Sequence, residues 1–452
     1  MFENLFHLRD HKVTVKGELT AGLTTFITMA YILAVNPQIL SQTGMPAGGV
    51  LIATAIASAI GCFCMAFFAN LPFALAPGMG LNAYFAYTVV IRMGYSWQMA
   101  LFAVFLEGLI FIVLSLTNVR EAIFNAIPIT LKNAISCGIG LFIAFIGLQS
   151  ANLVAGNPDT LVGFSGLNKN FSTAGISGLL CLIGVLIIIV LSHKKQKGAI
   201  LIGVLATWVL GMLAQAVGLY VPNPEANFFS LYPTWSAPHF GEFGGLVGQA
   251  FHLDFSSLKI LDLLAVTFAF LFVDIFDTVG TLAGVAAKAN MLDEKGQLPN
   301  ARGALLADAV ATSAGAVLGT STVTTFVESS AGVEAGGRTG LTALTTGLLF
   351  LAAMVLSPVF IAIPGFATAA ALIYVGFSMF QAVFKLVEVD ITEAFPAYLA
   401  ILAMPLFYSI AEGISMGVVS YVLIKLLTGK RKDISLLMYV LAIIFIARYI
   451  FM

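Results

Sequence analysis

The sequence predicts an all-α, polytopic membrane protein with fourteen transmembrane segments, arranged as two inverted seven-helix repeats with short β-strands in crossings 3 and 10. Three observations predict this class. Hydrophobic residues make up 60% of the 452 residues and charged residues 10%, whereas soluble domains carry about 25% charged residues. Apolar stretches of roughly 20 residues, long enough to cross a bilayer as helices, recur along the whole chain. Two of these stretches are interrupted by residues that disfavour a continuous helix.

The first crossing begins near Gly17 and runs through LTTFITMAYILAVNPQIL. No short apolar region followed by a small-residue cleavage site precedes it, so we expect no removable signal peptide. If the N-terminus lies in the cytoplasm, most basic residues fall in or beside cytoplasmic loops: Arg9, Lys12, Lys16, Arg120, Lys194, Lys195, Lys197, Lys288, Lys295, Arg302, Lys385, Lys430, Arg431 and Lys432. The opposite loops keep few, such as Arg92, Lys169 and Lys259. This asymmetry supports the predicted orientation.

A loop rich in Pro, Gly and aromatic residues, 221–257, divides the chain into a first repeat (1–220) and a second repeat (258–433). Each half holds seven predicted crossings, so the second half starts on the opposite side and the repeat is inverted. Short matches support it: FNAIP against FIAIP, and GAILIGV against GISMGVV. The apolar segment 434–452 is either a fifteenth crossing or a helix lying on the membrane. An inverted repeat is typical of secondary transporters.

The two interrupted segments occupy equivalent positions in the two halves. The third crossing contains NLPFALAPGMGLNAYFAYTVV, in which Pro72, Pro77, Gly78 and Gly80 interrupt the apolar span. The tenth contains GTSTVTTFVESSAGV, whose β-branched run favours an extended strand. Extended backbone is tolerated at membrane depth only where protein buries it or it lines a cavity. We therefore expect the two strands to pair at the midplane and to continue as half-helices whose N-termini face a cavity.

Three carboxylates lie near these segments. Glu328 falls where the second half-helix should begin, and Asp277 lies in LFVDIFDTVGTLAGV of the eighth crossing. A charge at mid-membrane costs on the order of 2.5–3.5 kcal/mol on insertion scales, so its default interpretation is functional. Asp274 lies three residues before Asp277, on nearly the same helix face. It either tunes its neighbour, takes part in proton coupling or makes structural bonds.

The remaining candidates have a structural interpretation beside the functional one. Asn82 either caps the first half-helix or hydrogen-bonds a ligand. Thr24, Thr25 and Thr28 either line the cavity or bond back to their own helix. Asp308 and Glu334 are expected to lie nearer loops and helix ends and to be structural. Four cysteines, Cys62, Cys64, Cys137 and Cys181, are expected to be small core residues rather than metal ligands.

Several functional classes are disfavoured. We find no H-E-x-x-H, G-x-S-x-G, Walker loop or Cys/His metal spacing, and the five histidines lie in terminal or loop regions. Nothing assembles a nucleophile with a base, so we do not expect an enzyme. The net charge of −1 and the absence of a long basic run argue against a nucleic-acid partner. We expect a lipid bilayer as the surrounding medium and no cofactor.

The motifs LAPGMGLNAYFAY, FDTVGTLAGV, GTSTVTTFVESSAGVEAGGRTGLTA and AGLTTFITMAYILAVNPQIL resemble the AzgA-like purine permeases, a branch of the nucleobase:cation symporter-2 family. The resemblance covers essentially the whole chain. It implies a core domain of crossings 1–4 and 8–11, a gate domain of crossings 5–7 and 12–14, and an elevator-like movement between them. It also implies a multi-pass protein of the inner cell membrane that imports purine nucleobases by proton symport.

The resemblance assigns the two substrate-binding carboxylates to Asp277 and Glu328 and the asparagine of the third crossing to Asn82. Wider relatives carry E-H-V-G-H-L where this chain has DTVGTL, so Thr281 replaces a histidine and proton transfer through that histidine is not available. FDTVGTL is closer to the guanine/hypoxanthine members than to the adenine members. The coupling proton is assigned to Glu328, Asp277 or Asp274, and sodium is not excluded.

We also expect the neighbours of Glu328, namely Thr325, Phe326 and Ser329, together with Thr28 and Thr281, to contribute to substrate binding. Phe26 and Phe85 are further candidates for stacking on a purine ring. The alternatives are an adenine permease and, from another class, a channel for small solutes or anions. The sequence leaves open whether the chain forms a homodimer.

Overall fold

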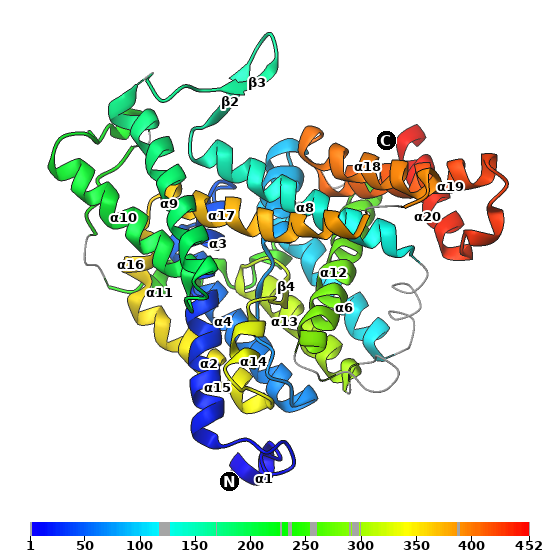
Figure 1. The fold of residues 1–452 in the computed structure, drawn as a ribbon, viewed down its shortest axis with the longest axis horizontal. Coiled ribbons are helices and arrows are strands. Elements are labelled where there is room, and N and C mark those ends of the chain that lie inside the picture. Colours follow the sequence, from blue (N-terminus) through cyan, green and yellow to red (C-terminus); the bar gives the residue numbers. More distant parts are fainter. Residues whose placement is uncertain are drawn as a thin grey trace.

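The structure is a computed structural model that describes residues 2–116, 127–168, 170–226, 228–233, 237–253, 260–288, 291, 298, 300–386 and 389–451. Figure 1 shows a mostly helical molecule. Ten helical segments of the described residues are long and apolar enough to cross a membrane. The predicted class, a helical polytopic membrane protein, is therefore confirmed.

One group of elements packs around α4 and α13. It comprises α2 (Val15–Met29), α3 (Ile32–Ser41), α4 (Ala47–Cys64), α6 (Trp97–Leu116), α12 (Ile260–Lys288), α13 (Ala301–Leu318), α14 (Ser329–Glu334) and α15 (Gly340–Ala353). Helix α13 contacts α4 and α6, α15 contacts α2 and α4, and α12 contacts α6. Short helices α1 (Phe2–Leu5), α11 (Phe240–Leu246) and α16 (Ser357–Ile361) lie at its periphery, where α11 and α16 contact α4.

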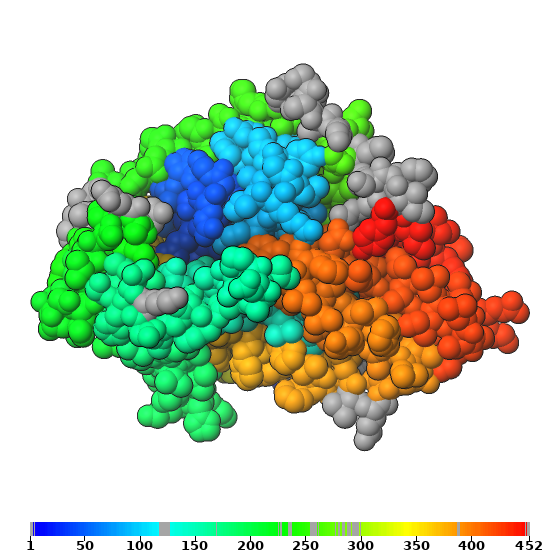
Figure 2. All heavy atoms as spheres, turned by 90° about the horizontal axis from the view of Figure 1, so that it is seen from above, coloured from blue at the N-terminus to red at the C-terminus, as the bar shows by residue number. Residues whose placement is uncertain are grey.

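A second group packs around α8. It comprises α8 (Ile129–Ser150), α9 (Ile176–His193), α10 (Ala199–Ala216), α17 (Gly365–Phe380), α18 (Ile391–Leu406) and α19 (Ile410–Leu427). Helix α8 contacts α17, α18 and α19, and α9 contacts α10 and α17. A Cβ on Gly376 would lie 2.4 Å from the carbonyl oxygen of Gly140, so α8 and α17 approach closely only because both positions lack a side chain. Figure 2 shows the teal and orange helices of this group side by side, on one side of the blue segments.

The two predicted strands form at the centre of the molecule (Figure 1). Strand β1 (Leu75–Pro77) pairs antiparallel with β4 (Val323–Thr325), with Ala76 opposite Thr324. Backbone bonds from Gly78 N to Thr322 O (3.0 Å) and from Phe326 N to Ala74 O (3.0 Å) extend the ladder at both ends. Each strand then continues into a short helix, α5 (Met79–Ala83) followed by the π-helical segment Tyr84–Arg92, and α14. The predicted strand pair is confirmed.

The strand pair explains the hydroxyl-rich stretch before Glu328. Side chains from five other elements contact successive hydroxyls of residues 320–324: Asn36 and Thr54 contact Thr320, Asn82 contacts Ser321, Glu107 contacts Thr322, and Thr278 contacts Thr324. All four hydroxyl residues of this stretch are at most 1% exposed. Buried polar groups require hydrogen-bond partners, and here the hydroxyls and the polar side chains of the surrounding helices are partners for one another. The hydroxyls thereby join the strand to those helices.

The C-terminal apolar segment forms α20 (Leu436–Phe451), which lies beside α19 (Figure 1). The hydroxyl of Tyr421 donates to the Asp433 carbonyl just before α20, and Ser415 bonds Tyr449 near its end. Helix α20 therefore runs antiparallel to α19 along most of its length. The contact with α19 is compatible with both alternatives for this segment, a crossing or a helix lying on the membrane.

An additional hairpin was not predicted. Strands β2 (Val154–Asn157) and β3 (Leu161–Phe164) pair antiparallel and are largely exposed. Asn157 Oδ1 accepts hydrogen bonds from the backbone N–H groups of Asp159 and Thr160, which closes the turn.

Candidate functional site

Glu328 lies at the point where β4 ends and α14 begins. It occupies the N-cap position of α14 and is half-buried. The hydroxyl of Tyr31, a residue 1% exposed between α2 and α3, donates a 2.7 Å hydrogen bond to its Oε1. The carboxylate of Glu328 is thereby held against the first crossing.

Asp277 lies beside the other half-helix. It is half-buried on α12, and a Cβ on Gly78 would lie 3.3 Å from its Oδ2 and 2.6 Å from Cγ2 of Thr324. The glycine lets the carboxylate approach the start of α5. Asp277 is also in electrostatic contact with Glu328 and Asp274. The fold thus brings the two predicted carboxylates together, one beside each strand end.

Asp274 belongs to a separate, fully buried cluster. The Thr278 hydroxyl lies 2.8 Å from Asp274 Oδ1, 3.0 Å from Asp308 Oδ2 and 2.7 Å from Thr324 Oγ1. All four residues are at most 1% exposed. Asp308, expected near a helix end, instead lies within α13 and joins this cluster. One hydroxyl thus connects α12, α13 and β4 directly behind Asp277.

Asn82 and Ser329 each contact a residue next to the β1–β4 strand pair. Asn82 is fully buried, and its Oδ1 accepts from the hydroxyl of Ser321. Ser329 accepts a 2.9 Å hydrogen bond from Ala74 N through its Oγ. Both contacts hold a half-helix against the strands. Asn82 lies inside α5, whose N-cap is Gly78, so the predicted capping role is wrong, while the substrate-binding roles of Asn82 and Ser329 stay predictions.

The other residues predicted around Glu328 divide between two faces of β4. Side chains alternate along a strand, so Phe326 shares the face of Thr324, toward α12, whereas Thr325 points to the opposite face. Phe326 is 6% exposed. The hydroxyl of Thr325 is buried and has no hydrogen-bond partner in the part of the chain that the structure describes. Thr281 is half-buried on α12, one turn after Asp277.

The threonines of the first crossing bond to their own helix. Thr28 donates to Thr25 O (2.7 Å), Thr25 to Ala21 O (3.1 Å) and Thr24 to Thr20 O (2.9 Å). Two further candidates for stacking are engaged in packing. Phe26 makes an edge contact with Phe350 at 5.3 Å between ring centroids, and Phe85 is fully buried against Phe270.

Two site residues were missed in the sequence. Tyr31 carries no motif of its own, and its partner Glu328 lies 297 residues away. Glu107, fully buried on α6, lies 2.8 Å from the hydroxyl of Thr322, and an intramembrane glutamate was the signal that should have marked it.

Comparison with known proteins shows which family the chain belongs to. Residues 16–446 match the model of a permease family. The chain is 46% identical to the guanine/hypoxanthine permease PbuO of Bacillus subtilis over 98% of both chains. It is 40% identical to the adenine permease AdeP of Escherichia coli over all of this chain and 96% of that one.

The chain belongs to the nucleobase:cation symporter-2 family of permeases. The predicted family is confirmed, and members of such a family are transporters rather than enzymes. The fold of the permease is also that of the transmembrane domain of a cyanobacterium bicarbonate transporter, BicA, with a TM-score of 0.64, 18% identity, and coverage of 88% of this chain and 97% of that one. At that identity the likeness describes the fold alone.

Proposed function

We propose that the permease imports the purine nucleobases guanine and hypoxanthine by proton symport. The observation that carries the proposal is the pair of half-buried carboxylates, Asp277 and Glu328, placed beside the two strand ends. Relatives 46% and 42% identical to the chain are named guanine/hypoxanthine permeases.

An oxopurine suits this arrangement. Its ring N–H groups are donors that carboxylates accept in strong, charge-assisted hydrogen bonds. Its 6-oxo group is an acceptor, and the first N–H groups of a helix such as α5 have no intrahelical partner. Phe326, on the face of β4 toward α12, supplies an aromatic surface for the ring.

An adenine permease is the second candidate, because AdeP is 40% identical to the chain over its full length. Adenine has an amino group where an oxopurine has the 6-oxo group, and it lacks the N1–H. A site built for one hydrogen-bonding pattern rejects the other strongly, since mismatched buried polar groups stay unpaired.

Proton coupling is assigned to Glu328, Asp277 or Asp274. Each of these residues lies beside the β1–β4 strand pair. Substrate binding to Asp277 and Glu328 would change the charge that Asp274 experiences. The Asp274–Thr278–Asp308 cluster is a place where a proton can be held out of contact with substrate. Sodium is the alternative coupling ion.

The proposed architecture has fourteen crossings. They are the ten long apolar segments, α12, the shorter α18 and the two strand–helix segments at β1 and β4. The group around α4 and α13, with the strand pair, is the proposed core domain, and the group around α8 is the proposed gate.

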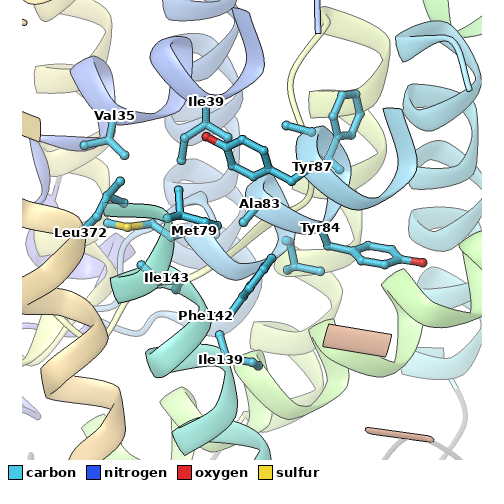
Figure 3. Packing of buried hydrophobic residues seen from close by; sticks show 14 of the residues in the cluster. Val35, Ile39, Met79, Ala83, Tyr84, Tyr87, Ile139, Phe142, Ile143 and Leu372 are labelled. Atoms are coloured by element: carbon cyan, nitrogen blue, oxygen red, sulfur yellow. The ribbon is translucent and has the colours of Figure 1, made fainter. Parts of the chain in front are cut away.

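An elevator-like movement requires a surface on which core and gate slide. Figure 3 shows Met79 and Ala83 of α5 facing Ile139, Phe142 and Ile143 of α8. These side chains are apolar and buried, and a Cβ on Gly80 would lie 2.9 Å from Cγ2 of Ile139. An apolar contact without directional bonds is compatible with sliding, which supports the proposed movement.

Uptake of radiolabelled hypoxanthine in cells lacking their own purine permeases tests the function. Unlabelled guanine, adenine, xanthine and uracil serve as competitors, and a protonophore and sodium-free buffer separate the coupling ions. Competition by guanine, lost with the protonophore, is the expected result. Stronger competition by adenine moves the chain to the second candidate, and non-saturable flux indicates a channel.

A further inference from the structure

Two adjoining cavities lie along α12. The first, of about 320 Å³, is lined by the polar side chains of Asp262, Glu412 and Tyr449 together with apolar ones such as Met93 and Val266. The second, of about 550 Å³, is lined mainly by apolar side chains from α12, α19 and α20, including Phe272 and Phe445. Ala265 lines both cavities, so they are neighbours. Neither is lined by Asp277 or Glu328, which places them apart from the candidate substrate site.

The lining changes from charged to apolar along α12. At 1.5 Å per residue, Thr267 lies ~7.5 Å and Phe272 ~15 Å beyond Asp262 along the helix axis. Thr267 is 3% exposed, lines the second cavity, and its hydroxyl has no hydrogen-bond partner within the described ranges. Buried polar groups normally have partners, so this hydroxyl indicates an occupant that carries an acceptor.

The apolar cavity opens toward the bilayer. Leu264 and Ile444 line it and are 57% and 45% exposed, on helices that belong to the membrane-embedded part of the chain. In the first cavity Asp262, whose Oδ2 also accepts from the Tyr95 hydroxyl, and Glu412 carry carboxylates, which attract a cation and disfavour a purely anionic head group.

We propose that this pair of cavities binds a phospholipid with a primary ammonium head group, as in phosphatidylethanolamine. The ammonium group bonds Asp262 and Glu412, an ester carbonyl accepts from Thr267, and an acyl chain lies between α12 and α20. The order of the carboxylates, the Thr267 hydroxyl and the apolar lining along α12 thus matches the order of head group, ester and acyl chain in one phospholipid molecule.

Native mass spectrometry of the purified full-length protein tests the proposal, with dioleoyl-phosphatidylethanolamine, -phosphatidylcholine and -phosphatidylglycerol added separately. The wild-type protein should bind the ethanolamine lipid about tenfold more tightly than either other lipid, since a quaternary ammonium donates no hydrogen bond and a glycerol head group carries no cation. Equal binding of the three lipids would overturn the proposal without recourse to any variant.

Variants then locate the site. Asp262→Asn combined with Glu412→Gln should reduce the preference for ethanolamine lipid at least fivefold, and Ala447→Phe should reduce binding of all three lipids by filling the apolar cavity. Asp159→Asn, in the exposed β2–β3 turn, is the matched control. Unchanged lipid binding in variants that retain the wild-type elution volume and helical circular dichroism would contradict the site. So would a mass of two chains without lipid, which would assign the surface to a second copy.

Discussion

The hydroxyl of Tyr31 donates a 2.7 Å hydrogen bond to Oε1 of Glu328, and so joins the break between α2 and α3 to the start of α14. This bond connects the first crossing to the end of the β1–β4 strand pair, at the glutamate that we propose to bind purine. Any movement of the first crossing therefore changes the surroundings of that carboxylate.

Tyr31→Phe removes only this hydroxyl. A hydrogen bond to a charged group contributes about 1.5–3 kcal/mol, and 1.4 kcal/mol is a factor of ten. We expect the KM for hypoxanthine uptake to rise about tenfold while the amount of protein in the membrane is unchanged. Tyr421→Phe, whose hydroxyl bonds the Asp433 carbonyl, is the matched control, and an unaltered KM in Tyr31→Phe would remove Tyr31 from the site.

Gly78→Ala tests the approach of Asp277 to α5. The added methyl group would lie 2.6 Å from Cγ2 of Thr324 and 3.3 Å from Asp277 Oδ2, so the strand pair or the carboxylate must shift. Misplacement of about 1 Å can cost a hundredfold in function. We expect uptake below about one-tenth of wild type. Gly156→Ala, where a Cβ meets nothing within 4 Å, should transport normally, and wild-type uptake by Gly78→Ala would refute this geometry.

Thr278→Val tests the buried cluster. Valine keeps the shape of threonine but leaves Asp274, Asp308 and Thr324 without their shared hydroxyl. Loss of a buried hydrogen-bond partner costs about 1–3 kcal/mol, so the melting temperature of the purified protein should fall. Thr278→Ser restores the hydroxyl and should retain most of the stability. A valine variant with the melting temperature of the wild-type protein would show that the cluster does not stabilise the fold.

Glu18→Gln tests how the chain after α14 is held. Glu18 is fully buried and accepts four hydrogen bonds, from the N–H groups of Arg338 and Thr339 and from the hydroxyls of Thr339 and Thr342. An amide nitrogen cannot accept, so the substitution should cost about 1–3 kcal/mol in stability. The exposed Glu3→Gln is the control. Equal melting temperatures for the two variants would show that these bonds contribute little.

The strand pair was predictable because its signal is local. Pro77, Gly78 and the β-branched run from Thr322 to Thr325 exclude continuous helices, and unpaired backbone at membrane depth requires a partner. The expectation that Glu328 begins a half-helix beside Asp277 followed from the same reasoning. The family was recognisable for a related reason, since its motifs surround these segments.

Side-chain partners were not predictable, because they depend on tertiary distance. The partner of Asn82 is Ser321, 239 residues away, which no local pattern around Asn82 indicates. Asp308 was expected near a loop or helix end, whereas it lies in the interior of α13, where its contact with Thr278 of α12 depends on the tertiary fold. The position of α20 depends on its packing against α19 and α12, which an apolar segment of 16 residues does not specify.

Binding of radiolabelled hypoxanthine to purified protein tests the central claim, that Asp277 and Glu328 together hold the purine. We predict that Glu328→Gln and Asp277→Asn each raise the Kd at least tenfold, whereas Glu334→Gln, an exposed residue at the end of α14, binds as wild type. Wild-type affinity in both carboxylate variants would contradict the account.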